Sequence, residues 1–191
     1  MKGIKGTETE KNLLANFAGE SQARNRYTYF ASEAKKAGYE QISWIFTDTA
    51  ENEKEHAKRF FRFLEGGDLV ITASYPSGTI SVQADNLKSA IDGENLEANV
   101  LYPEAAVTAD REGFDEIARV YRAIAQVEAQ HEKRFRALLG NIEAGTVFKK
   151  NIPVKWRCRN CGYVHEGSEA PAECPACAHP LAYYELLAEN Y

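Results

Sequence analysis

The sequence predicts a mainly α-helical chain: a four-helix bundle with one long crossover connection, followed by a small domain built around four cysteines. Three observations support this fold class. Helical periodicity fills most of residues 7–142, two segments within that region repeat each other, and all four cysteines of the 191-residue chain fall within residues 158–177. The apolar fraction of 44% is sufficient for a buried core in a chain of this length.

The first half of the bundle is predicted to be two helices that meet at Gly38. Residues 7–37 carry apolar side chains at three- and four-residue steps, and either Thr7 or Thr9 is suited to cap the first helix. The second helix is expected from about Tyr39 to Glu65, where two glycines end it.

The second half follows a long polar connection. Residues 66–85 are too many for a tight hairpin, so they are expected to cross from one end of the bundle to the other. A third helix is expected over residues 85–112, with Pro103 kinking or locally ending it. Gly113 then turns the chain into a fourth helix that ends near Ile142.

A repeat relates the two halves, because residues 37–64 align with residues 112–139 after a shift of 75 positions. The shift superposes two Glu-x-x-His pairs, which are Glu53 with His56 and Glu128 with His131. Residues three apart on a helix point to the same side, so each pair presents a carboxylate and an imidazole together. One such pair alone is more often a solvated surface feature, but the repeat favours two metal ions in one bundle core.

Further glutamates lie at the height of these pairs. At about 1.5 Å per residue from the two turns, five carboxylates fall within about 6 Å of one level; they belong to Glu20, Glu53, Glu94, Glu97 and Glu128. Buried carboxylates are costly unless paired or bound to metal, and two ferrous ions would bring four positive charges to them. Ligands rich in oxygen suit iron or manganese, although ligand type does not exclude zinc.

The repeat is asymmetric at Glu97, because its counterpart in the first half is Gln22. One metal therefore has a ligand choice that the other lacks. Tyr27 and Tyr102 are related by the repeat and lie on the ligand-bearing helix faces. They are either core tyrosines or hydrogen-bond partners of the ligands and of bound oxygen species.

The tail, residues 146–191, changes in character. It has no helical period and is too short to fold by apolar burial alone, so a metal is expected to hold it together. Its cysteines form two Cys-x-x-Cys knuckles separated by twelve residues, which are Cys158 with Cys161 and Cys174 with Cys177. Four thiolates at this spacing predict a tetrahedral site for iron or zinc, and a purely structural zinc ribbon is the alternative.

Composition excludes several classes of partner. The net charge is −5 and no cluster of Lys or Arg stands out, so neither nucleic acid nor an anionic membrane is an expected partner. No apolar stretch is long enough to span a bilayer and the first residues lack a signal-peptide pattern, which together favour a cytoplasmic location.

A di-iron bundle followed by a four-cysteine tail resembles the rubrerythrin family over essentially the whole chain. The resemblance implies a ferritin-like bundle over residues 1–145 and a rubredoxin-like iron domain with short β-strands over residues 146–191. It implies that Glu53 and Glu128 bridge an oxo- and carboxylate-bridged iron pair, with Glu20 and Glu94 as terminal ligands. It also implies that one iron exchanges Glu97 for His56 between redox states, whereas His131 stays on the other. The four cysteines match the ligands of the rubredoxin-like iron, but Ala178 stands where glycine is usual.

This resemblance implies a peroxidase that reduces hydrogen peroxide to water in defence against oxidative stress, with Glu97, His56, Tyr27 and Tyr102 as catalytic residues. The thiolate-bound iron would pass single electrons from an external donor, either rubredoxin or an NAD(P)H-dependent reductase. The chain has no dinucleotide-binding fingerprint, so the reductase would be a separate protein. A homodimer or larger oligomer is expected, with the tail of one subunit near the bundle of its partner.

Two other functions are compatible with the residues. A ferroxidase that handles iron would use the same bundle site, although an appended tail complicates the packing of a storage shell. A non-enzymatic electron carrier or zinc-stapled scaffold would leave the bundle metal merely structural.

Overall fold

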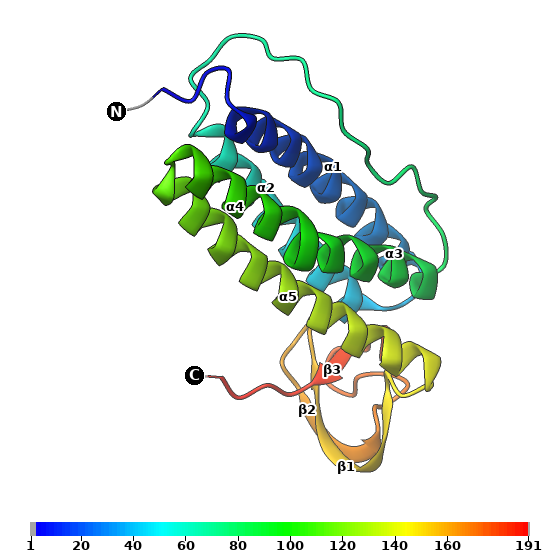
Figure 1. Cartoon of the computed structure of the whole chain (residues 1–191). Coiled ribbons are helices and arrows are strands. Elements are labelled where there is room, and N and C mark those ends of the chain that lie inside the picture. The colour runs from blue at the N-terminus through cyan, green and yellow to red at the C-terminus, as the bar shows by residue number, and fades with distance from the viewer. Residues whose placement is uncertain (1–2, 191) are drawn as a thin grey trace.

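Two antiparallel helix pairs form the bundle, and a small sheet domain hangs from one end of it (Figure 1). This computed structural model describes residues 3–190 and confirms the predicted fold class. The first pair is α1 (Glu8–Lys36) and α2 (Glu40–Phe61). The second pair consists of α3 (Gln83–Leu96), the π-helical turn η1 (Glu97–Leu101), α4 (Tyr102–Glu112) and α5 (Asp115–Glu143).

The ends of the first pair differ partly from the prediction. Thr7 caps α1 as expected, since its hydroxyl accepts a hydrogen bond from the backbone N–H of Glu10 at 3.1 Å. The prediction that the second helix continues to Glu65 is wrong, because α2 ends at Phe61. Residues 62–64 tighten into a turn that packs Phe63 and Leu64 against the core near that end, which an apolar period alone does not reveal.

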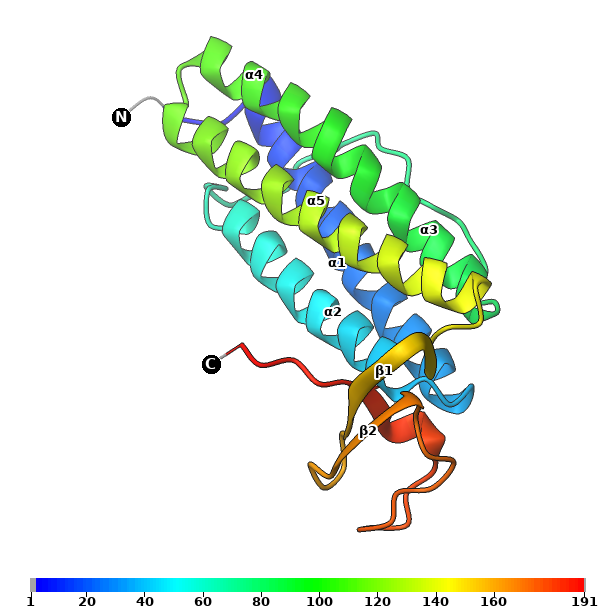
Figure 2. The ribbon, with the colours of Figure 1, turned by 90° about the horizontal axis from the view of Figure 1, so that it is seen from below.

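The crossover between α2 and α3 runs outside the bundle along α1 (Figures 1 and 2). Tyr75 fastens it there by donating a hydrogen bond to the carbonyl of Ala15 at 2.6 Å. The crossover ends where the Asn86 side chain accepts from the N–H of Ser81 and donates to its carbonyl, at the start of α3. The bundle therefore has the single long connection that the sequence predicts.

The predicted third helix is interrupted at the level of the glutamates. Pro103 lies in the first turn of α4, where its missing N–H is tolerated. The five residues before α4 widen into η1, and Glu97 is the first of them. The prediction of a local break at Pro103 thus takes the form of a π-helical turn, a feature common at functional sites.

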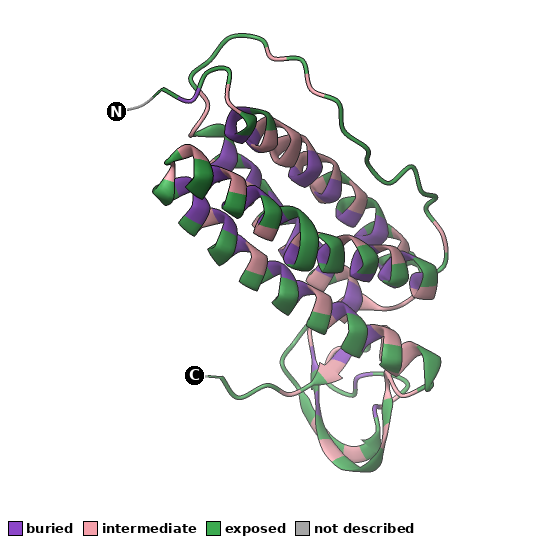
Figure 3. Cartoon of the chain, in the orientation of Figure 1, coloured by how far each residue is buried: buried purple, intermediate pink, exposed green. Residues whose placement is uncertain are grey.

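The buried residues of the helices lie on the faces turned toward one another (Figure 3), where the apolar ones form two clusters. The lower cluster includes Phe30, Phe46 and Phe135, and the upper cluster includes Phe60 and Tyr121. Along each of α1, α2, α3 and α5, a buried glutamate lies near the middle of the bundle, between the levels of the two clusters. These glutamates form a charged layer that divides the core. Among the described helices, none has both the length and the apolar character that a membrane crossing would require.

The tail domain is a three-stranded antiparallel sheet of order β2-β1-β3, made of β1 (Lys149–Cys158), β2 (Val164–Glu169) and β3 (Tyr184–Leu186). Trp156 is fully buried at its centre, and its indole N–H donates to the carbonyl of Gly167 at 3.0 Å. The predicted boundary after residue 145 falls between the end of α5 and the start of β1.

The tail rests against the start of α2. Phe148 stacks on Tyr39 with ring centroids 6.0 Å apart, and the Arg159 guanidinium lies 5.2 Å from the ring centroid of Trp44. Glu53 lies thirteen residues beyond the first residue of α2, which corresponds to about 20 Å along the helix. The tail therefore contacts the bundle at the end of α2 that precedes the carboxylate layer.

Candidate metal centres

Two groups of metal-ligating side chains meet in the charged layer of the bundle. The first consists of Glu20, Glu53, His56 and Glu128. The second consists of Glu53, Glu94, Glu128 and His131. Within each group the potential ligand atoms lie within 4.8 Å of one another. Taken together, the two groups draw at least one side chain from each of α1, α2, α3 and α5. The sequence prediction that these residues converge is thus met by the fold.

Glu53 and Glu128 belong to both groups. Glu53 places Oε2 2.9 Å from Nδ1 of His56 and Oε1 3.1 Å from Nδ1 of His131. Glu128 places Oε1 2.9 Å from Nδ1 of His56 and Oε2 2.9 Å from Nδ1 of His131. A carboxylate whose oxygens face two different centres is arranged to bridge two ions.

Glu20 and Glu94 each complete one group. Oε1 of Glu20 lies 3.6 Å from Nδ1 of His56, and Oε2 of Glu94 lies 3.4 Å from Nδ1 of His131. Each half of the layer therefore has one nitrogen atom surrounded by three carboxylates. Such mixed nitrogen and oxygen ligands suit iron or manganese.

The cluster contains many buried polar atoms that have no hydrogen-bond partner within residues 3–190. They are Oε2 of Glu20, both carboxylate oxygens of Glu53 and Glu128, Oε2 of Glu94, and Nδ1 of His56 and His131. Unpartnered buried polar atoms are rare because each costs about 1–3 kcal/mol. Every residue of the two groups has at least one such atom, so the residues present fit a pair of bound cations.

The charges of the metal-free cluster are unevenly distributed. Burial and the neighbouring charge of Glu53 raise the pKa of Glu20 well above its usual range and that of Glu94 to about 8. Burial opposes protonation of the histidines, but the close carboxylates of Glu128 and Glu53 outweigh it and raise the pKa of His56 to about 10 and that of His131 to about 12. Protons thus occupy the place of cations in this layer.

Tyr27 and Tyr102 are both fully buried and contact the cluster. The Tyr27 hydroxyl donates to Oε1 of Glu94 at 2.6 Å, and the Tyr102 hydroxyl donates to Oε1 of Glu20 at 2.5 Å. Each tyrosine therefore orients, from across the bundle, the carboxylate that belongs to one group only. This geometry favours the second of the two sequence interpretations, in which the tyrosines are hydrogen-bond partners of ligands.

Glu97 lies beside the cluster rather than in it. It is half-buried, and its carboxylate is absent from both four-residue groups. Burial and the charges of Glu94 and Glu128 raise its pKa well above the usual range, which places it in the same electrostatic field. In this structure His56 is turned into the first group while Glu97 stands outside it, so their predicted exchange stays a prediction.

Asn52 is the residue of this site that the sequence interpretation missed. Its side-chain oxygen lies 3.1 Å from Nε2 of His131, on the ring edge opposite the cluster. Asn52 immediately precedes Glu53, and the equivalent position in the repeat is Val127. This difference between two otherwise similar segments was the available signal.

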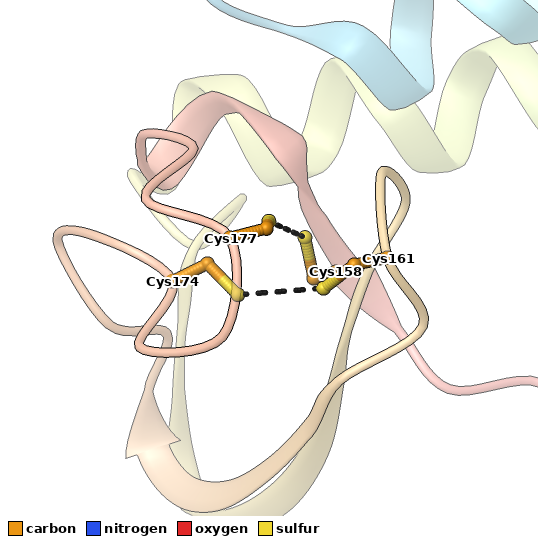
Figure 4. A group of neighbouring side chains, drawn as sticks. All are labelled: Cys158, Cys161, Cys174 and Cys177. Carbon is orange, nitrogen blue, oxygen red and sulfur yellow. Dashed lines mark hydrogen bonds between the residues drawn. The ribbon is translucent and has the colours of Figure 1, made fainter.

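The four cysteines come together in the tail at the turns that follow β1 and precede η2 (Leu181–Tyr183) (Figure 4). Their Sγ atoms lie 3.8 Å apart for Cys158 and Cys177 and 3.7 Å apart for Cys161 and Cys174. These distances are far too long for disulfides. They match the sulfur separation of about 3.8 Å expected for a tetrahedron with metal–sulfur bonds of about 2.3 Å.

The second knuckle has a strained backbone at Ala178, which stands where glycine is usual. Ala178 has a φ of 54°, and among residues 3–190 it is the only non-glycine residue with a positive φ. Its N–H donates to the carbonyl of Cys174 at 2.8 Å, just as the N–H of Gly162 donates to the carbonyl of Cys158 at 2.9 Å. The two knuckles thus share one turn geometry, with glycine in the first and alanine in the second.

Comparisons with known proteins agree with both metal sites. A family model described as rubrerythrin matches residues 11–139, and a model described as the rubredoxin-like domain of rubrerythrin matches residues 156–185. A rubrerythrin of Porphyromonas gingivalis is 61% identical over 100% of this chain and 95% of its own length. A rubrerythrin of Nitratidesulfovibrio vulgaris is 56% identical over the full length of both chains.

Among solved structures, fully reduced, all-ferrous nigerythrin is similar with a TM-score of 0.64 and 29% identity. The match covers 97% of this chain and 92% of that one. The similarity extends over both the bundle and the tail.

Proposed function

The chain belongs to the rubrerythrin family of di-iron oxidoreductases, and on that premise we propose that it is a peroxidase that reduces hydrogen peroxide to water. The observation that carries this proposal is the pair of ligand groups that share Glu53 and Glu128 in a chain that also holds a four-thiolate site. Reduction of one peroxide to two waters consumes two electrons and two protons. A ferrous pair held by these residues would supply those two electrons.

The ligand roles follow from which groups each residue joins. Glu53 and Glu128 would bridge, Glu20 and Glu94 would be terminal ligands, and His131 would bind the second ion. His56 and Glu97 would alternate as ligands of the first ion. Glu97 suits this role because its carboxylate lies at the start of a π-helical turn beside the cluster.

The two buried tyrosines would hold protons at the site. Burial and the nearby carboxylate of Glu94 raise the pKa of Tyr27, and burial and Glu20 raise that of Tyr102, both well above the usual range. The phenols therefore stay protonated at neutral pH and donate to the terminal carboxylates. They keep those carboxylates oriented and are placed to deliver protons as hydrogen peroxide is reduced.

Residues 146–191 would form the electron-entry domain. Iron held by Cys158, Cys161, Cys174 and Cys177 carries one electron at a time. Cys161 is exposed, which gives an external donor access to one edge of the site. We expect that donor to be rubredoxin or a separate NAD(P)H-dependent reductase.

A homodimer or larger oligomer is part of this proposal. The tail of a chain rests at the start of α2, and Glu53 lies about 20 Å along that helix from its first residue. A partner subunit arranged head to tail would bring its cysteine domain closer to the cluster. Sizing of the protein at working concentration tests this, and a monomer would contradict it.

An anaerobic titration tests the activity. The protein would be loaded with iron, fully reduced and mixed with hydrogen peroxide while the visible band of the ferric thiolate site is followed. Rapid return of the band, with about two electrons consumed per peroxide, is expected from the balance given above. No return of the band would reject the peroxidase and move a ferroxidase or a structural role ahead.

A further inference from the structure

The two histidines of the cluster are held differently at the ring nitrogen that faces away from it. Nε2 of His131 lies 3.1 Å from Oδ1 of Asn52. Within residues 3–190, Nε2 of His56 has no hydrogen-bond partner, and the His56 side chain is 13% exposed, compared with 4% for His131. The two rings therefore differ in restraint although their Nδ1 atoms have equivalent surroundings.

The internal repeat explains this difference. Asn52 precedes Glu53 on α2, and the residue that precedes Glu128 on α5 is Val127. Asn52 can accept a hydrogen bond from the histidine on the facing helix, whereas a valine at the equivalent place cannot. The asymmetry between His131 and His56 is thus encoded at one position of the repeat.

A second contact strengthens the same side. Arg134, one helical turn after His131, donates to Asp48 at 2.8 Å and to Thr49 at 2.7 Å. The residues equivalent to Asp48 and Thr49 are Ala123 and Ile124, which offer no side-chain acceptor. Arg59, the counterpart of Arg134, instead donates to the exposed Glu116 at 2.9 Å, so the two arginines join α2 and α5 through different partners.

A hydrogen bond on the far nitrogen of a histidine fixes its tautomer and ring orientation. Because Oδ1 of Asn52 is an acceptor, Nε2 of His131 must donate, which leaves Nδ1 to face the cluster as the ligand atom. His56 lacks this restraint, so rotation away from the cluster breaks no hydrogen bond at its Nε2.

We propose that Asn52 is a positioning residue that fixes His131 on the metal pair, and that Val127 at the equivalent position leaves His56 free to rotate. Asn52 and Val127 thereby determine which of the two repeat-related histidines stays bound and which can be exchanged. This inference rests on the proposed di-metal centre, but it does not depend on the peroxidase activity.

Zinc binding to the full-length protein tests the proposal, because zinc is diamagnetic and needs no redox step. Asn52→Leu removes the acceptor at similar volume, and Asn52→Asp retains one. We expect Asn52→Leu to weaken binding of one bundle ion about 10- to 100-fold, and Asn52→Asp to restore it. Equal zinc affinity in wild type and Asn52→Leu would overturn the proposal.

Nitrogen-15 spectra of the histidine side chains provide the second measurement. In the wild type, the Nε2 proton of His131 should exchange slowly with water and that of His56 quickly. Asn52→Leu should make the His131 proton exchange quickly, and Val127→Asn should slow that of His56. If neither variant changes the exchange, Asn52 does not position His131, whatever its effect on folding. If wild type binds zinc only at the cysteines, the proposed metal centre itself fails.

Discussion

Glu53 and Glu128 face the same two histidines in matching fashion, each with one oxygen toward His56 and the other toward His131. The four oxygen–nitrogen distances lie between 2.9 and 3.1 Å. A change at either carboxylate therefore affects both ligand groups, whereas a change at Glu20 affects only the first.

Glu53→Gln should abolish binding of both bundle metals, because it removes one of the two carboxylate charges that the two groups share. Glu20→Gln should weaken only one of them. Metal analysis after desalting checks this, with the visible band of the cysteine site as an internal standard. Glu55→Gln is the matched control, since Glu55 is exposed on the same helix and pairs with Lys58. A Glu53→Gln protein that retains both bundle metals would refute the bridging role.

Glu97→Ala should slow peroxide reduction at least about tenfold, which corresponds to about 1.4 kcal/mol of transition-state stabilisation. The reason is that His56 would then have no carboxylate to exchange with, whereas the ligands already grouped around His131 are untouched. Turnover is measured with a saturating artificial donor, and the spectrum of the cysteine site should be unchanged. Turnover equal to wild type would remove Glu97 from the catalytic residues.

Ala178→Gly should stabilise the tail domain by about 0.5 kcal/mol. A side chain at a φ of 54° costs about 1–2 kcal/mol, and the added freedom of glycine in the unfolded chain offsets part of that cost. Loss of the visible band of the cysteine iron during denaturant unfolding measures the effect. Ala176→Gly, two residues earlier and without positive φ, should instead destabilise the domain. A lower midpoint for Ala178→Gly would contradict the strain argument.

The sequence predicted most of the bundle site because the repeat places ligands at equal heights from two turns. Glu53, Glu128 and the histidines could be found from helix geometry alone, and the strained backbone at Ala178 from its place in the knuckle. The end of α2 and the π-helical turn at Glu97 could not, since both depend on how side chains pack after the helices meet. Asn52 was missed for the same reason, because its partner His131 lies 79 positions away on another helix.

The metal-free protein should become less stable as pH rises from about 5 to about 10. The folded-state pKa values of Glu94 and His56 are raised, to about 8 and about 10. For each group, the folded state binds more protons than the unfolded state at any pH between its unfolded-state pKa and its raised folded-state pKa. Stability is therefore lost as pH rises through this window. Each extra proton contributes about 1.4 kcal/mol per pH unit.

Thermal unfolding in the presence of a chelator measures this dependence. Glu20→Gln should flatten it, because the folded-state pKa of Glu20 is also raised and its amide cannot release a proton on unfolding. Protein loaded with metal should lose this dependence, since the ions displace the protons that the cluster holds. A metal-free protein whose stability rises between pH 6 and 9 would mean that the carboxylates and histidines are not coupled as the distances of about 3 Å between them require.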